Sequence, residues 1–389
     1  MTGRLCALLL LLVAAVGKTV AGGAPVLRVD LRTWGATGLQ GWIDKPIKPA
    51  PDRSLTFLDN STLAVSFPVF NPEAKLSTRE HPGGASIVFH TALVDVHTGQ
   101  VKGERNWGSV YLPHTMVGIR GGRLLVRTGD DLGIYSPDWK LEQHYQLAST
   151  GDEYGSARVE VSPSGKTAYV ISREAPNRER VQILGDSNGE QSFGFTVNST
   201  GTDAISDSHF VFVLPEDKQS AFFALSLKAM KGKSPRPPKP LSYKGEGDCA
   251  RPVFVAGDLM VLAGLCHSIL LLQADGGLLA KMKLGEPDLV HNVRASRDQP
   301  RFALLLSETR FATVPGEERT QVFRGAQVRV YEIDRQFDEV GQRLKLRKLF
   351  QRQLDIGNEE EHRVDLALSP DGSLLALLNG WNLTVYRLR

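Results

Sequence analysis

Four segments of the chain combine a glycine, one or more carboxylates and a basic residue, in that order. They are GDEYGSAR (151–158), GEGDCAR (245–251), GEPDLVHNVR (285–294) and GNEEEHR (357–363). Each ends on an arginine, and a guanidinium binds carboxylate or phosphate through paired N–H donors. The segments therefore supply six candidate ligands for an anionic group: Arg158, Arg251, Arg294, Arg363, His291 and His362.

The same pattern has two simpler interpretations. Each arginine could be neutralised by a carboxylate of its own or a neighbouring segment, and such a pair would latch two structural units together. The charges could also be solvated surface groups with no ordered pairing. The spacing of these residues does not distinguish among a ligand site, ion pairs between units and solvated surface charges. The carboxylates would form a peripheral acidic belt of Asp152, Glu153, Glu246, Asp248, Glu286, Asp288 and Glu359 to Glu361.

The usual catalytic and metal-binding motifs are absent from the sequence. The nine histidines form no HxH, HExxH or His/Cys cluster. The chain also has no Walker loop and no G-x-G-x-x-G after a strand. We therefore predict no catalytic residue, no metal site and no cofactor, although an active site assembled from separate segments would leave no such motif.

The elements that must position these residues are short strands. Apolar runs such as SLLALL (373–378), SILLL (268–272) and FALLL (302–306) alternate with turns such as SPSG (162–165) and SPDG (369–372). Units of about four strands recur at a spacing of roughly 40 to 70 residues, which is the signature of a β-propeller. Near-continuous apolar runs fit blades that are buried on both faces. We predict an all-β fold with seven four-stranded blades. Because the sixth unit is overlong, a fold with eight blades is the alternative.

The two ends of the chain predict how the ring closes. The last unit, VDLALSPDGSLLALLNGWNLTVYRL (364–388), has three strands, and VLRVDL (26–31) is a strand with nothing upstream to pair with. If the N-terminal strand completes the last blade, no sheet edge is left open.

The repeats resemble those of secreted propellers of the tryptophan-aspartate-repeat-like class, particularly bacterial ones whose units carry S-P-D-G turns. The resemblance is at the level of the repeat, because the Gly-His and Trp-Asp dipeptides of the eukaryotic repeat are absent. It implies the propeller fold and says little about activity.

The N-terminus predicts export. Arg4 precedes an apolar run from Leu5 to Val16, and small residues follow it. This pattern is typical of a signal peptide over residues 1–21, cleaved after Ala21, and it leaves a propeller domain over residues 25–389. The run is shorter than the roughly 20 apolar residues that a membrane span needs. We expect a secreted or periplasmic monomer, and a net charge of +3 gives no indication of nucleic-acid binding.

Export leaves two cysteines in the mature chain, Cys249 and Cys266. The segment CARPVFVAGDLMVLAGLC (249–266) predicts a hairpin with a two-residue turn at Gly257–Asp258. That turn would place the cysteines directly opposite each other, at a separation that suits a disulfide. An oxidising compartment favours the bridge over two thiols.

The loops between second and third strands predict a binding surface. They should lie on the same face as the four arginine segments. Each of those segments should place its arginine at the mouth of an inner strand, so that the six candidate ligands gather near one rim of the channel. Three are long, at 68–84, 173–180 and 307–325, and Phe70, Phe311 and Phe323 are candidate anchors for a partner. We expect a non-enzymatic scaffold that docks a protein or peptide there. One alternative is a lyase or hydrolase acting on an anionic sugar or lactone, with His291 or His362 as base. Another is a structural element of the cell envelope with no ligand.

Overall fold

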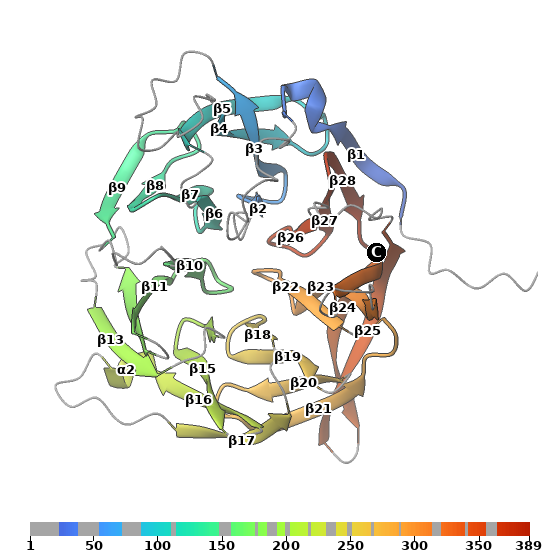
Figure 1. Ribbon diagram of the computed structural model, residues 1–389. Coiled ribbons are helices and arrows are strands. Elements are labelled where there is room, and N and C mark those ends of the chain that lie inside the picture. The colour runs from blue at the N-terminus through green and yellow to red at the C-terminus, as the bar shows by residue number, and fades with distance from the viewer. Residues whose placement is uncertain are drawn as a thin grey trace, which may run out of the picture.

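The chain forms a ring of seven four-stranded antiparallel sheets around a central channel (Figure 1). The computed structural model describes residues 23–37, 54–71, 87–109, 114–147, 157–175, 178–184, 193–198, 203–216, 219–230, 239–246, 251–265, 268–287, 289–312, 320–338, 341–354 and 364–389. The predictions of an all-β fold and of seven blades are therefore confirmed.

Each blade runs from an inner strand at the channel to an outer strand at the rim. In that order the strands are β2 (Leu55–Phe57), β3 (Thr62–Phe70), β4 (Ile87–Asp95) and β5 (Val101–Ser109) in blade 1; β6 (His114–Ile119), β7 (Arg123–Thr128), β8 (Asp131–Tyr135) and β9 (Leu141–Gln146) in blade 2; β10 (Arg158–Val161), β11 (Ala168–Ala175), β12 (Arg178–Leu184) and β13 (Phe193–Asn198) in blade 3; β14 (Asp203–Ile205), β15 (His209–Glu216), β16 (Gln219–Ser226) and β17 (Lys239–Glu246) in blade 4; β18 (Arg251–Phe254), β19 (Leu259–Leu265), β20 (Ser268–Gln273) and β21 (Leu278–Lys283) in blade 5; β22 (Leu289–Ala295), β23 (Arg301–Ala312), β24 (Thr320–Asp338) and β25 (Gly341–Gln353) in blade 6; and β26 (Val364–Leu368), β27 (Leu374–Asn379), β28 (Asn382–Arg387) and β1 (Pro25–Asp30) in blade 7. Within the described ranges two short helices, η1 (Leu31–Trp34) and α2 (Leu227–Met230), accompany the strands.

The last blade is completed by the first strand of the chain. β1 pairs antiparallel with β28, with Leu27 opposite Val385 and Val29 opposite Leu383. In Figure 1 the blue β1 lies beside the red β28. The prediction that the N-terminal strand closes the ring is confirmed, and the first and last blades are locked together.

Neighbouring blades are held together by apolar side chains between their faces. Alternate residues of a strand point to opposite faces, so Leu375 and Leu377 pack against blade 6, whereas Leu374 and Leu378 pack against blade 1. The buried hydrophobic residues of the described chain fall into clusters that each join two adjacent blades. This explains why the strands are apolar in continuous runs.

Polar contacts join the turns between first and second strands. The Asp207 carboxylate of the blade 4 turn accepts hydrogen bonds from Ser162 and Ser164 of the blade 3 turn, each at 2.7 Å between oxygens. In the same way Asp258 of blade 5 accepts from Ser206 of blade 4, at 2.7 Å. These contacts lie on the face opposite the crossover segments, which lead from each outer strand to the next inner strand.

Two of the expected loops are partly strand. Residues 307–312 and 320–325 continue β23 and β24, with Thr309 opposite Phe323 and Phe311 opposite Gln321. Likewise, β11 continues to Ala175 and β12 begins at Arg178. The loop prediction was wrong for these residues because the strands of both hairpins continue through them and pair backbone groups that a loop would leave to water.

The cysteine hairpin differs from the expected register. Arg251 pairs with Ala263 and Phe254 with Met260, one residue away from the register that places the cysteines opposite each other. The reason is a three-residue loop in which Ala256 and Gly257 both have positive φ, 51° and 82°, instead of a two-residue turn. Cys249 and Cys266 lie outside the described residues, as does the expected signal peptide, so both the bridge and the cleavage stay predictions.

No helix among the residues that the structure describes is long and apolar enough to cross a membrane.

Removing the Leu31 side chain should weaken the packing between blades 1 and 7 where the ring closes. Leu31 is 0% exposed and packs with residues of blades 1 and 7, so Leu31→Ala should lower the free energy of unfolding by about 2–5 kcal/mol. Arg28→Ala, at an exposed position of β1, should change it by less than about 0.5 kcal/mol. Urea unfolding of both variants checks this, and equal effects would contradict the assigned role of Leu31.

Candidate functional site: the central channel and the crossover face

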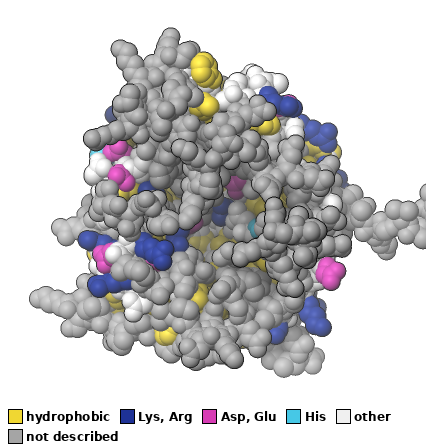
Figure 2. Space-filling model, in the orientation of Figure 1, with side chains coloured by type: hydrophobic (Ala, Val, Ile, Leu, Met, Phe, Trp, Pro, Cys, Tyr) yellow, Lys and Arg dark blue, Asp and Glu magenta, His cyan; other side chains and the backbone are white. Residues whose placement is uncertain are grey.

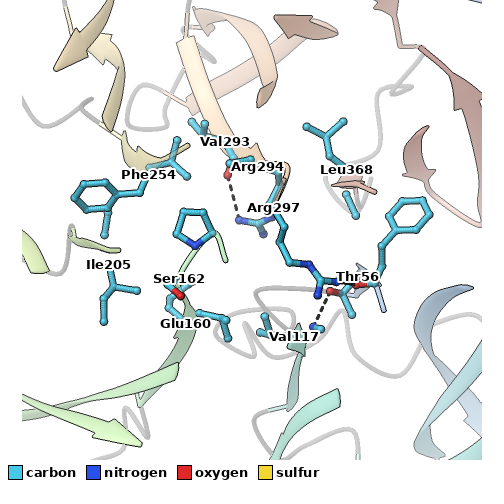
Figure 3. A pocket seen from close by; sticks show the side chains of 18 of the residues that line it. Thr56, Val117, Glu160, Ser162, Ile205, Phe254, Val293, Arg294, Arg297 and Leu368 are labelled. Atoms are coloured by element: carbon cyan, nitrogen blue, oxygen red, sulfur yellow. Dashed lines mark hydrogen bonds between the residues drawn. The ribbon is translucent and has the colours of Figure 1, made fainter. Parts of the chain in front are cut away.

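The inner strands of all seven blades line one central cavity of about 170 Å³ (Figure 3). Its wall is mixed in character. Apolar side chains such as Ile205 and Phe254 alternate with Thr56, Glu160 and Arg294. The space-filling view shows the ring hollowed at its centre, with side chains of several kinds visible there (Figure 2). The cavity has room for a few waters or a small ligand.

Arg297 closes part of the channel at the end opposite the crossover face. It belongs to the turn after β22 in blade 6, and its Nη2 donates to the carbonyl oxygens of Phe57 and Leu58, at 2.6 and 3.0 Å. Nη1 donates to the Ile119 carbonyl at 3.2 Å. One side chain therefore caps the ends of β2 and β6 across the channel, and Figure 3 shows it extended toward Thr56. Burial lowers the pKa of Arg297.

Arg158 connects blades 3 and 4. It is the first residue of β10, and its Nη2 lies 3.1 Å from Glu179 Oε1 in its own blade and 2.5 Å from Asp203 Oδ2 at the start of β14. The Tyr169 hydroxyl donates to the other Asp203 oxygen at 2.9 Å. Both carboxylates are buried. Arg158 thus forms the inter-blade latch that the sequence pattern left open as an alternative to a ligand site.

Burial and charge pull the pKa values of this cluster in different directions. Burial raises the pKa of Asp203 to about 6, and the Arg158 guanidinium only partly offsets it. Burial likewise raises the pKa of Tyr169 well above its ordinary value. Burial by itself would lower the pKa of Arg158, but the charges of Asp203 and Glu179 outweigh it and hold that pKa above its usual value. The cluster is therefore a coupled set of charges in the channel wall.

Arg294 makes a second contact between blades, from blade 6 to blade 7. Its Nη2 lies 3.8 Å from Asp365 Oδ1. The other oxygen of Asp365 accepts from the backbone N–H groups of Ser54 and Leu55, at 2.7 and 3.1 Å, and so ties blade 7 to blade 1. Arg294 is the sixth residue of β22, not the first. The expectation that it stands at the mouth of its strand was wrong, because the strand already begins at Leu289.

The remaining predicted rim residues are only partly covered by the structure. Arg251 is the first residue of β18, as its segment predicts. His291 lies in β22, and its Nε2 is 2.5 Å from the oxygen of the buried Ser307. Arg363 and His362 lie outside the described residues. The expected gathering of all six residues at one rim therefore stays a prediction.

The three predicted aromatic anchors lie at different kinds of positions. Phe70 is the last residue of β3 and is 62% exposed, although the first seven residues of that strand are buried. Phe311 and Phe323 are strand residues of the blade 6 hairpin. Phe70 lies at the crossover end of its blade, because second strands end where the crossover segments lie.

Several important residues were not predicted. Asp203 and Asp365 stand at the start of the inner strands DAI and VDLAL, where a carboxylate interrupts an otherwise apolar segment. That interruption is a signal available in the sequence. Nothing in the sequence marks Arg297, because its partners are about 180 and 240 positions away. Within the described ranges no group of three or more His, Cys, Asp or Glu side chains is arranged to hold a metal ion.

The fold and the channel define a class of protein, the seven-bladed β-propeller. A chain in the crystal structure of the Mitotic Checkpoint Complex is similar over 96% of this chain and 97% of its own length, with a TM-score of 0.53 and 12% identity. The C-terminal WD40 domain of Sif2 gives a TM-score of 0.47 at 13% identity, over 96% of this chain and 100% of the domain. The Kluyvelomyces marxianus protein Hsv2 gives a TM-score of 0.46 at 12% identity, over 76% of this chain and 85% of its own length.

No protein-family model matches the sequence, and no curated protein matches it. The similarity to solved structures concerns the fold alone, at these identities. The resemblance to tryptophan-aspartate-repeat propellers at the level of the repeat is confirmed.

Breaking the Arg158 latch should destabilise the ring. Arg158→Gln leaves two buried carboxylates without their cation, which typically costs about 3–5 kcal/mol in the free energy of unfolding. The control is Arg178→Gln in the same blade, whose contact with Glu174 is exposed and should contribute no more than about 1 kcal/mol. Chemical unfolding of both variants tests this. A loss below about 1 kcal/mol for Arg158→Gln would show that the cluster is not a latch.

The same cluster predicts a pH dependence of stability. Asp203 has a pKa of 3.8 in its ordinary state and about 6 in the folded protein. Its stabilising contribution to the free energy of unfolding is therefore fully present below pH 3.8 and is lost as the pH rises through about 6. Asp203→Asn should remove this decrease in urea titrations from about pH 4 to about pH 7. An equally steep pH dependence in the variant would mean that another group titrates.

Proposed function

We propose that the chain is an exported, non-enzymatic scaffold that docks a protein or peptide on its crossover face. The observation that carries the proposal is Phe70, a large aromatic side chain that is 62% exposed at the crossover end of a strand otherwise buried. Exposed aromatic residues on a rigid framework are typical anchors of protein interfaces. The ring provides that framework, because its blades are joined by apolar clusters and its ends are paired.

The channel supports this choice of surface. Arg158 and Arg294, which the sequence offered as anion ligands, each lie beside a carboxylate of the next blade. Their charge is thus already used within the ring. The cavity between them has a volume of only about 170 Å³, below the roughly 300 Å³ of ordinary ligand pockets. A partner on the crossover face would contact the loops and not the channel wall.

A photo-cross-linking amino acid at position 70 tests this function. The substituted chain should cross-link a specific partner in an extract of the compartment where the protein resides. Excess wild-type chain should suppress the product, whereas excess Phe70→Ala should suppress it at least about tenfold less effectively, as expected for loss of an aromatic anchor. The matched control position is Leu278, which is 52% exposed at the start of an outer strand, on the opposite face. Equal products from the two positions would contradict docking at Phe70.

Export is the second part of the proposal and has its own test. The apolar run from Leu5 to Val16 supports it, and cleavage after Ala21 gives a mature chain that begins at Gly22. Mass spectrometry of the protein recovered from its source should find that N-terminus. A chain that retains Met1 to Ala21 would rule out the signal peptide, while leaving the docking surface untouched.

A further inference from the structure

A second cavity, of about 440 Å³, opens in the wedge between the outer parts of blades 1 and 2. One wall comes from the outer strand β5, with Arg105 and Trp107. The other comes from blade 2, with Thr128, Tyr135 and His144. This side pocket is separate from the central channel, and none of the motifs in the sequence pointed to it.

Arg105 is held in the side pocket by aromatic rings. Its guanidinium carbon lies 4.7 Å from the centre of the Trp107 ring and 4.8 Å from that of Tyr135. Nη1 donates to the Trp139 carbonyl at 2.9 Å. Within the part of the chain that the structure describes, Nε and Nη2 have no hydrogen-bond acceptor. Ring contacts fix a guanidinium without using its donors, so the remaining N–H groups are positioned for a ligand.

We propose that the side pocket binds a carboxylate group, held by the Nε and Nη2 donors of Arg105. The guanidinium fork matches the two oxygens of a carboxylate. Asp131 lines the pocket as well, with its carboxylate 3.0 Å from His144 Nε2. That negative charge repels a dianionic phosphate more strongly than a singly charged carboxylate. The ligand is therefore an acidic side chain of a peptide or a small organic acid, and the site is distinct from the docking surface at Phe70.

The chain contains a matched control for this site. Arg352, in the outer strand of blade 6, lies 5.1 Å from the ring centre of Tyr386 in the third strand of blade 7. Arg105 and Tyr135 occupy the same two kinds of strand in blades 1 and 2. An arginine stacked on a tyrosine thus recurs between blades. Beyond that contact, Arg105 has a second ring and a cavity beside it.

The experiment uses the full mature chain and three probes: acetate, a capped tripeptide with one central glutamate, and the same peptide with glutamine. The indole N–H signal of Trp107 is followed by NMR. We expect acetate and the glutamate peptide to shift this signal, and the glutamine peptide to leave it in place. Tighter binding of the glutamate peptide than of acetate identifies a peptide segment as the ligand, whereas equal affinity identifies a small organic acid. No shift with either acid, or an equal shift with the glutamine peptide, would overturn the proposal.

Variants separate binding from packing. Arg105→Gln should weaken the binding of the acidic probes at least about tenfold, and Arg352→Gln should bind them like the wild type. Arg105→Lys keeps the positive charge but loses the planar fork of donors, so it should also weaken the binding of the acidic probes. This second variant keeps the proposal testable if Arg105→Gln fails to fold. Wild-type affinity in either pocket variant would overturn the proposal.

Discussion

The whole ring depends on the pairing of β1 with β28, which joins residues from the two ends of the chain. Every blade is apolar on both faces, so an open arc would expose one hydrophobic face at each end. Closing the arc buries both faces in a single cluster that contains Leu31, Leu55 and Leu383. A strand edge left unpaired would also invite pairing with other chains. One short N-terminal strand thus removes two exposed faces and one open edge.

The polar groups of the channel follow from the same geometry. Where seven inner strands converge, the space is too narrow for large apolar side chains from every blade, and backbone groups at strand ends need partners. Long arginine side chains meet both demands. Arg297 donates to carbonyl groups of blades 1 and 2, and Arg158 neutralises a carboxylate of blade 4. The guanidiniums that suggested an anion site in the sequence therefore serve largely to join one blade to the next.

What the sequence could predict was local or periodic. Apolar runs and SPDG turns predicted the blades, and the lone strand at the N-terminus predicted the closure. The sequence could not show where a long side chain ends, and so it missed the reach of Arg297 across the channel. It also placed Arg294 at the wrong end of its strand, because carboxylates suggested a loop where the pairing with β23 had already begun. The predicted register of the cysteine hairpin was wrong by one residue. The sequence did not indicate the longer turn, since the positive φ of Ala256 is uncommon for a residue other than glycine, asparagine or aspartate.

The side pocket between blades 1 and 2 is a consequence of how blades diverge. Neighbouring sheets spread apart toward the rim, so larger side chains must fill the outer part of each wedge. Two of the residues that line this pocket are glycines, Gly108 and Gly133, and a Cβ on Gly133 would lie 2.5 Å from the Tyr135 ring. Aromatic rings fill the space instead, and the cluster of buried hydrophobic residues here is the smallest of those in the described chain. The cavity in this gap is lined by the rings of Trp107 and Tyr135 and by Arg105. A rigid ring can thus carry a binding pocket at its rim without any change in its channel.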